Sequence, residues 1–302
     1  MTGKYRTPEA FRAAFDVRAK REATVSGRPL QRVLNVYLMQ RFLARAIDAL
    51  GDRVTVKGGM ALELRLERAR TTRDVDLRLE GHRDHHVDVL RRRVQQAGEP
   101  DWLTYQLAEN ADDPGIDGDG VVYEGVRFRA QAFLAAKKYG ASFGVDIAIG
   151  DPMIGPREHR SGPNLLDIVG APDVAVPLYP LATHLAEKLH AYTLPRARPN
   201  GRLKDLVDVA LIASELVVDG GTLRTAIDTT FSFRRSHALP FTLPLPPAEW
   251  TARYARDRDE QGLAWPSIDE VHAEAARFLE PVLRGPSGAW DPAARAWAPP
   301  AG

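Results

Sequence analysis

The chain has no cysteine among its 302 residues. Disulfide bonds and thiolate metal sites are therefore excluded, and any metal chemistry must use carboxylates or histidines. The sequence also lacks an apolar stretch long enough to span a membrane, and its N-terminus lacks the apolar core of a signal peptide. We therefore expect a cytoplasmic protein with no membrane partner.

Charge of one sign is not in excess either, because 41 basic residues stand against 40 acidic ones. This balance excludes a uniformly basic nucleic-acid-binding protein, but it allows a local basic track. The length suffices for one large domain or two modest ones with a substantial core. Two packed halves are the expectation.

The periodicity of apolar residues indicates an α/β first half with a mixed sheet. Spacing of three and four predicts helices, and strict alternation or β-branched runs predict strands. An acidic, glycine-rich stretch predicts a loop at residues 106–120. The expected helices are residues 30–50, 60–67 and 85–97, and the expected strands are residues 54–56, 74–79, 126–135 and 141–149, the last two as a hairpin.

Prolines are dense between residues 152 and 180, which disfavours regular structure and indicates a crossover between halves. We place the boundary there, so that residues 1–155 form the core with an N-terminal helix and residues 156–302 form a mainly helical domain. The proline-containing tail after Gly285 is expected to pack loosely. The helices expected in this second half are residues 181–193, 203–217, 221–231, 248–258 and 268–284.

Three carboxylates form the first candidate site. Asp74 and Asp76 lie two apart on a predicted strand and so share a face, and Asp146 lies in an otherwise apolar strand. An unpaired carboxylate there would be costly to bury, and a bound cation would offset the cost. Oxygen ligands suit Mg²⁺, with Mn²⁺ as an alternative, and two such ions can support in-line displacement at phosphorus. We predict Asp74, Asp76 and Asp146 as metal ligands and catalytic residues, with Asp146 either assisting the metal or acting as base.

A glycine pair supplies a second candidate feature. Gly58 and Gly59 carry no Cβ, so the backbone can approach phosphates closely, and N–H groups at the start of the following helix can point at them. Lys57 and Arg65 are candidate cations for a bound triphosphate, although Arg65 could equally lie on the helix surface. Taken singly, an Asp-x-Asp or a Gly-Gly has an ordinary structural explanation.

The combination is more specific than its parts. A strand, Gly-Gly, a helix, Asp-x-Asp about fifteen residues on and a later acidic strand resemble the polymerase-β-like nucleotidyltransferase superfamily. Within it, residues 30 to 217 resemble the AbiEii-type toxin nucleotidyltransferases, including the mycobacterial MenT group. The resemblance implies a mixed-sheet nucleotidyltransferase core with a helical C-terminal half.

Two further segments carry the resemblance to the toxin family, Glu187–Ala191 and Lys204–Asp208. In that family the corresponding lysine and last aspartate are catalytic, which implies Lys188 and Asp208. A lysine facing a phosphate site can neutralise developing charge, and Asp205 shares a helix face with Asp208 and could orient the lysine or the nucleotide. An ordinary surface ion pair is the alternative. Met60 is a departure, because many relatives carry Ser or Thr there.

The resemblance also implies a function. Such a toxin transfers a nucleoside monophosphate from an NTP, often CTP, to the 3′ end of tRNA and so blocks aminoacylation, and it is countered by a cognate antitoxin protein. We expect a monomer when the chain is free. The alternatives are transfer to a protein or small molecule, and a catalytically silent nucleotide- or RNA-binding regulator. Basic groups that could follow RNA, or simply be solvated, are Arg65, Arg68, Arg70 and Arg73, Lys137–Lys138, and Arg234–Arg235.

Thr71 and Thr72 directly precede the acidic strand. Phosphorylation there would place negative charge beside the carboxylates and repel a triphosphate. We take this as a hypothesis for silencing by an antitoxin.

Overall fold

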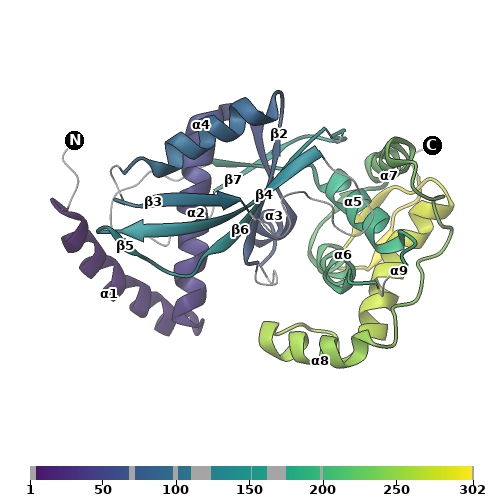
Figure 1. Ribbon diagram of the computed structural model, residues 1–302. Coiled ribbons are helices and arrows are strands. Elements are labelled where there is room, and N and C mark those ends of the chain that lie inside the picture. Colours follow the sequence, from purple (N-terminus) through teal and green to yellow (C-terminus); the bar gives the residue numbers. More distant parts are fainter. Residues whose placement is uncertain are drawn as a thin grey trace.

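The computed structural model describes residues 5–67, 72–97, 101–109, 124–150, 152–161, 175–197 and 200–300. A sheet with its helices forms one half of the molecule and a helical bundle forms the other (Figure 1). The elements of the first half are α1 (Pro8–Ser26), α2 (Leu30–Leu50), β1 (Val54–Lys57), α3 (Gly58–Glu63), β2 (Asp74–Leu79), α4 (Arg83–Gln95), β3 (Thr104–Glu109), β4 (Glu124–Leu134), β5 (Lys137–Lys138), β6 (Phe143–Ile149), β7 (Glu158–Ser161) and β8 (Ala175–Leu178).

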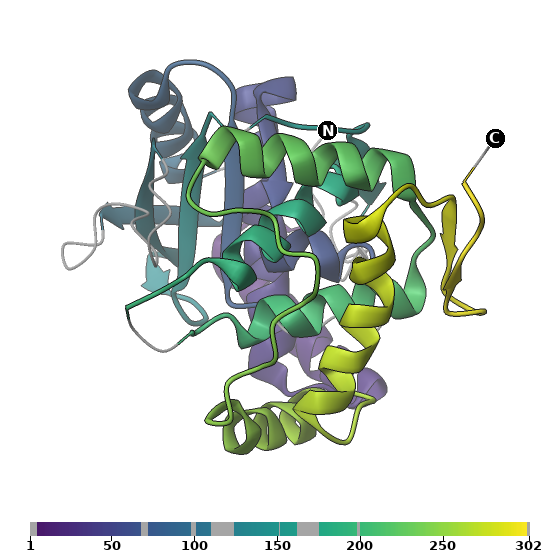
Figure 2. The same ribbon diagram turned by 90° about the vertical axis from the view of Figure 1, so that its right-hand side faces the viewer.

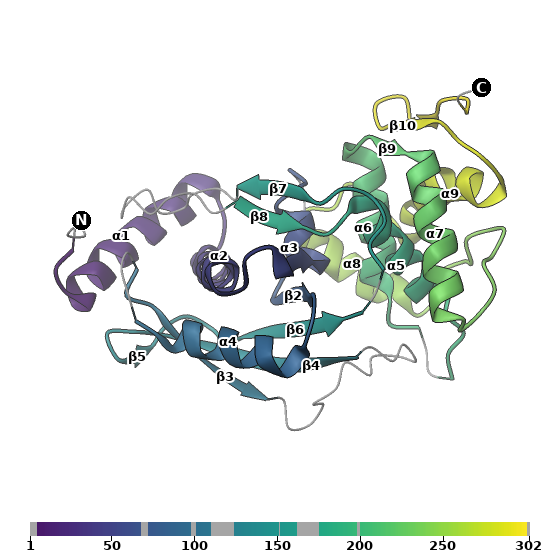
Figure 3. The ribbon, with the colours of Figure 1, turned by 90° about the horizontal axis from the view of Figure 1, so that it is seen from above.

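The sheet has the order β3-β4-β6-β2-β1-β8-β7, with β5 paired to β4. The pairs β2–β6 and β1–β8 are parallel and the remaining pairs of this sheet are antiparallel, so the predicted mixed sheet is confirmed. Seen from above, the sheet bends around α2, with β7 and β8 on one side of the helix and β4 and β6 on the other (Figure 3). This arrangement buries the apolar side of the sheet.

The burial pattern of β2 explains how the sheet presents its acids. Val75, Leu77 and Leu79 are fully buried in the core that α2 shares with the sheet. Asp74 and Asp76 alternate with them and therefore leave the opposite face. One strand thus stabilises the core with one side and carries the candidate chemistry on the other.

The sheet continues past residue 155, where the sequence analysis placed the boundary. β7 and β8 lie in the proline-rich stretch, and β8 pairs with β1 through Val56 and Leu178. Pro177 is tolerated in β8 because this strand is short and its ladder with β1 is limited to the pair of Val56 and Leu178. The division into domains stays a prediction.

The loop expected at residues 106–120 is wrong in its first part, because β3 continues to Glu109. The remainder of the expected loop, from residue 110, lies outside the described residues.

The second half consists of helices around its own apolar core. Figure 2 views this half directly. Its helices follow the predicted ranges closely, and α5 packs on α7 while α6 packs on α9. The elements are α5 (Leu181–Thr193), α6 (Leu203–Glu215), β9 (Val218–Asp219), α7 (Gly220–Arg234), α8 (Trp250–Gln261), α9 (Ile268–Arg284), β10 (Ala289–Asp291) and β11 (Ala296–Trp297).

The C-terminal tail is not loosely packed, contrary to the expectation. β10 lies between β9 and β11 in a small antiparallel sheet. Trp290 is 1% exposed, and its indole Nε1 donates to the carbonyl of Ala213 at 2.7 Å. Tryptophan burial with a satisfied N–H outweighs the local effect of the prolines.

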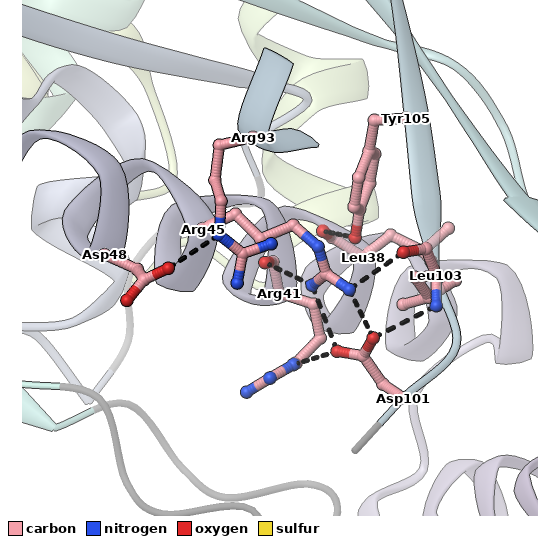
Figure 4. Close-up of polar contacts among 8 residues, drawn as sticks. All are labelled: Leu38, Arg41, Arg45, Asp48, Arg93, Asp101, Leu103 and Tyr105. Atoms are coloured by element: carbon pink, nitrogen blue, oxygen red, sulfur yellow. Dashed lines mark hydrogen bonds and ion pairs between the residues drawn. The ribbon is translucent and has the colours of Figure 1, made fainter. Parts of the chain in front are cut away.

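A buried ion-pair cluster connects α2 to the start of β3 (Figure 4). Asp101 is fully buried and accepts from Arg41 and, at 2.5 and 3.1 Å, from Arg45. Burial alone would raise the pKa of Asp101, but the two guanidiniums hold it below its ordinary value. Arg45 also donates to the carbonyl of Leu103 at 2.8 Å, so the cluster fixes the sheet on α2.

Among the helices that the structure describes, none is both long and apolar enough to cross a membrane.

Candidate active site

A cavity of about 330 Å³ lies where the sheet meets α5 and the start of α6. Its walls therefore come from both halves of the chain, and its volume is that of a small-molecule site. The residues lining it are Lys57, Gly58, Gly59, Asp76, Leu77, Arg127, Asp146, Ala148, His184, Glu187, Lys188, Ala191, Gly201, Arg202, Lys204 and Asp205.

The sheet contributes a row of charges in register. Lys57 of β1 pairs with Asp76 of β2, which pairs in turn with Asp146 of β6. Asp146 then pairs with Arg127 of β4. Residues paired across a sheet share a face, so the row runs positive, negative, negative, positive over roughly 14 Å of neighbouring strands. The two acids of the row lie side by side at its centre.

Two glycines make room for the acids of β2. Gly58 has a φ of +62°, and a Cβ at this position would overlap the carboxylate of Asp76. A Cβ at Gly144 would likewise overlap the carboxylate of Asp74. Gly58 is therefore required twice, by its backbone conformation and by the side chain that covers it.

The charges of the row change the pKa of Asp76. Burial of its carboxylate, and then the negative charges of Asp146 and Asp74, raise the pKa of Asp76 to about 7. Lys57 and Lys188 oppose this rise without cancelling it. Negative charge is thus in excess at the centre of the row, where a bound cation would be stabilised.

Lys188 faces this row from α5. Its Nζ lies 2.7 Å from Asp208 Oδ2 and 2.9 Å from Asp205 Oδ1, both on α6. Lys188 is 7% exposed and Asp208 is fully buried, so the alternative of an ordinary surface pair is wrong. Asp205 lines the cavity with the lysine, whereas Asp208 lies beneath it and is not part of the wall.

Glu187, the residue before this lysine, connects several cationic and polar groups. Its carboxylate lies 2.8 Å from Lys57 Nζ, accepts from the Tyr179 hydroxyl at 2.8 Å, and lies 3.5 Å from Arg234. Arg234 also contacts the ring of His190 at 3.3 Å. Burial, and then the charge of Arg234, lower the pKa of His190 to about 3, so this ring is neutral at physiological pH. Glu187 therefore fixes Lys57 beside Asp76 from the opposite half of the molecule.

The carboxylates differ in how well they fit a metal ion. In the described part of the chain, no group of three or more His, Cys, Asp or Glu side chains gathers closely enough to hold an ion. Asp146 is engaged by Arg127 through two hydrogen bonds of 2.9 and 3.0 Å. Asp74 and Asp76 fit one Mg²⁺, which commonly takes one or two carboxylates and completes its shell with phosphates and water.

Four predicted residues lie away from the cavity wall. Arg65 has a buried guanidinium that donates to the carbonyl of Tyr179 at 2.6 Å and lies 3.3 Å from Glu158, so it connects α3 to β7 and β8 and does not reach the cavity. Met60 is buried in the sheet's core. Thr72 is buried, and its hydroxyl donates to the carbonyl of Asp74, while Thr71 lies outside the described residues. Asp74 itself is exposed beyond the cavity wall.

The predicted basic tracks are only partly described, because Arg68 and Arg70 lie outside the described residues. Lys137 and Lys138 are exposed at the tip of the hairpin, away from the cavity wall. The cations that do line the cavity, besides the two lysines predicted from sequence, are Arg127, Arg202 and Lys204.

Arg127 and Glu187 were missed by the sequence analysis. The predicted hairpin of residues 126–135 and 141–149 could have identified Arg127, because pairing of its two strands places Arg127 opposite Asp146. Glu187 stood next to Lys188, but its partner Lys57 is 130 residues away in sequence, and no local pattern indicates that pairing.

A mixed sheet with a glycine turn and an acidic row, facing a buried lysine from a helical half, defines the nucleotidyltransferase class of site. The family model for "Nucleotidyl transferase AbiEii toxin, Type IV TA system" matches residues 41–279. The chain therefore belongs to this family, and the resemblance stated from sequence is confirmed.

Solved structures with a similar fold include MenT4, a nucleotidyltransferase toxin of Mycobacterium tuberculosis H37Rv, with 18% identity and a TM-score of 0.52 over 88% of this chain and 98% of that one. A putative nucleotidyltransferase from H. pylori matches at 11% identity and a TM-score of 0.46, covering 83% of this chain and 94% of that one. JHP933 from Helicobacter pylori matches at 11% identity and a TM-score of 0.46, covering 84% and 92%. No curated protein matches the sequence.

Proposed function

We propose that this protein is a toxin that transfers a nucleoside monophosphate from an NTP, CTP in the first instance, to the 3′ end of tRNA. The observation that carries the proposal is the pair of facing charges in one cavity, Asp76 on the sheet and Lys188 on α5. Membership of the toxin family adds support. The cytoplasm is the proposed location, and a cognate antitoxin the proposed partner of an otherwise monomeric chain.

In the proposed reaction the acceptor hydroxyl oxygen attacks the α-phosphorus of the NTP, the bond to pyrophosphate breaks, and the hydroxyl proton passes to a carboxylate of the acidic row or to water. Asp74 and Asp76 would hold one Mg²⁺, or Mn²⁺, which supplies positive charge to the triphosphate when bound. Gly58 and Gly59 leave space for the phosphates to approach the backbone. Lys188 neutralises the charge that develops on the phosphates, and Asp205 holds its ammonium group in place.

Arg202 and Lys204 extend the positive lining beyond Lys188. Arg202 directly precedes α6 and Lys204 lies in its first turn, so both add positive charge to the cavity wall beside Asp205. Cations in this position would hold an RNA backbone without reading its sequence. This favours a nucleic-acid acceptor over a neutral small molecule.

The test is transfer of label from each α-³²P-labelled NTP, with Mg²⁺ and either total tRNA or a protein extract as acceptor. We expect label at the 3′ end of tRNA, and loss of this label in the Asp76→Asn variant. Asp228→Asn is the matched control, because Asp228 is a half-exposed acid on the surface of α7 and pairs only along its helix with Arg224. Its transfer should equal that of the wild type.

The other outcomes separate the alternatives. Label only in protein or in a small molecule would replace tRNA as the acceptor. No label in any acceptor, from a folded chain that still binds NTP, would favour the silent regulator. Growth arrest on expression, relieved by a neighbouring gene product, would support the toxin assignment independently.

A further inference from the structure

Arg127 binds the carboxylate of Asp146 through two hydrogen bonds. It lies opposite Asp146 in the β4–β6 ladder, and its Nε and terminal nitrogen donate to the two carboxylate oxygens at 2.9 and 3.0 Å. A bidentate pair of this kind has a defined geometry and is stronger than a single ion contact. Both side chains also line the cavity. Asp146 therefore faces a permanent positive charge within the site.

A two-metal site would require the carboxylate of Asp146 to bind a metal ion. Two ions about 3.5–4 Å apart need carboxylates that can each turn toward the ions. The third acid is the group that would hold the second ion, but its two oxygens are directed at Arg127. Consistent with this, no cluster of three possible ligands occurs in the part of the chain that the structure describes.

The acids of β2 are arranged differently. Asp76 lies over Gly58 and Asp74 over Gly144, so each carboxylate fills the space left by a missing Cβ. The acids of β2 thus lie over glycines, whereas Asp146 lies against a guanidinium, so Asp74 and Asp76 are the acids left to hold one divalent ion.

We propose that this protein binds a single divalent metal ion at Asp74 and Asp76, and that Arg127 supplies at Asp146 the positive charge that a second ion would otherwise provide. The purpose assigned to this positive charge rests on the proposed nucleotidyl transfer, but the number of bound ions does not. The number of bound ions can be measured without any transfer.

A charge built into the chain behaves differently from a bound ion. The guanidinium of Arg127 is a fixed part of the chain, and it cannot be removed by a chelator. Replacement of Arg127 by a neutral residue should allow Asp146 to bind a metal ion, because Asp146 then lies near Asp74 and Asp76 without the positive charge of the guanidinium.

The experiment is electron paramagnetic resonance of Mn²⁺ added to the full chain with a non-hydrolysable NTP analogue and no acceptor. Two Mn²⁺ ions at the separation of a two-metal site give a spin-coupled spectrum, whereas a single ion gives an uncoupled one. The analogue with Mn²⁺ but without protein is measured in parallel. For the wild type we expect an uncoupled spectrum and one ion per chain.

Two variants test the role of Arg127. Arg127→Gln should bind a second ion and show the coupled spectrum. Arg93→Gln is the control, because Arg93 forms an arginine–aspartate pair with Asp48 on the surface of α4 and does not line the cavity. It should bind one ion, as the wild type does. Circular dichroism and thermal melting establish that each variant is folded.

A coupled spectrum with two ions in the wild type would overturn the proposal, and this result does not depend on whether any variant folds. A folded Arg127→Gln protein that still binds one uncoupled ion would also overturn it, as would a wild type that binds no ion at the β2 acids. One ion in a chain that transfers no nucleotide would instead remove the proposed function and leave the metal count in place.

Discussion

Removing Lys188 should destabilise the protein through the acid it leaves behind. Its ammonium lies 2.7 Å from Asp208, which is fully buried, and 2.9 Å from Asp205, which is near the cavity surface. Breaking a buried pair by removing one partner costs about 3–5 kcal/mol, because the remaining charge loses its counter-charge without regaining water. We therefore expect Lys188→Met, which keeps the length of the side chain, to lower the free energy of unfolding by about 3 kcal/mol.

The second variant isolates the charge. Asp208→Asn in the Lys188→Met background removes the stranded carboxylate at nearly constant volume, so the double variant should be about 2 kcal/mol more stable than Lys188→Met alone. The assay is denaturant unfolding followed by circular dichroism. Arg253→Met is the control, because Arg253 is exposed on α8 and its pair with Asp257 should contribute less than about 1 kcal/mol.

This expectation is refuted if Lys188→Met unfolds within about 1 kcal/mol of the wild type, or if adding Asp208→Asn to Lys188→Met brings no gain in stability. Either result would mean that the lysine and Asp208 do not form the buried pair that the structure shows.

Three further predictions concern the glycine turn, Asp76 and the tail. Gly58→Ala should abolish transfer, and in the same unfolding assay it should cost more than the roughly 1–2 kcal/mol of an alanine in the left-handed conformation. Gly262→Ala is the control, because Gly262 has a similar φ of +64° with open space around it and should show the backbone cost alone. The pKa of the Asp76 carboxyl is about 7 in the folded chain and near 4 in the unfolded chain, so between these pH values only the folded chain keeps the carboxyl protonated. The stability that this group contributes is present below pH 4 and is lost as the pH rises through 7. Asp76→Asn should therefore exceed the wild type in thermal stability at pH 8 without metal, by at most about 4 kcal/mol, and match it at pH 4. Trp290→Ala should cost about 3–5 kcal/mol on unfolding; a loss under 1 kcal/mol would favour the loosely packed tail expected from sequence.

The regular elements could be predicted because their signal is local. Apolar residues at helical spacing marked α2, and the alternation in β2 marked both the strand and the face that carries Asp74 and Asp76. Both are determined by which side chains must leave water, and this is visible within about ten residues of sequence.

The elements that were missed depend on partners far along the chain. β8 is short and contains Pro177, yet it forms because Val56 of β1 offers it a parallel edge, and the backbone N–H of Tyr179 then donates to the carbonyl of Val56 at 2.8 Å. Trp290 in the tail is likewise held by the carbonyl of Ala213. Tertiary contacts of this kind override the local preference set by proline.

The candidate site shows the same limit in its electrostatics. The sheet brings Asp76 next to Asp146, where burial and the charge of its neighbour disfavour the ionised form of Asp76. The helical half supplies the positive Lys188 opposite Asp76, and also the acid Glu187 that holds Lys57 at the other end of the row. The glycine pair and the Asp-x-Asp identify a class of chemistry, but the site is complete only where the two halves meet, because Lys57 pairs with Glu187 and Asp76 faces Lys188 across that boundary.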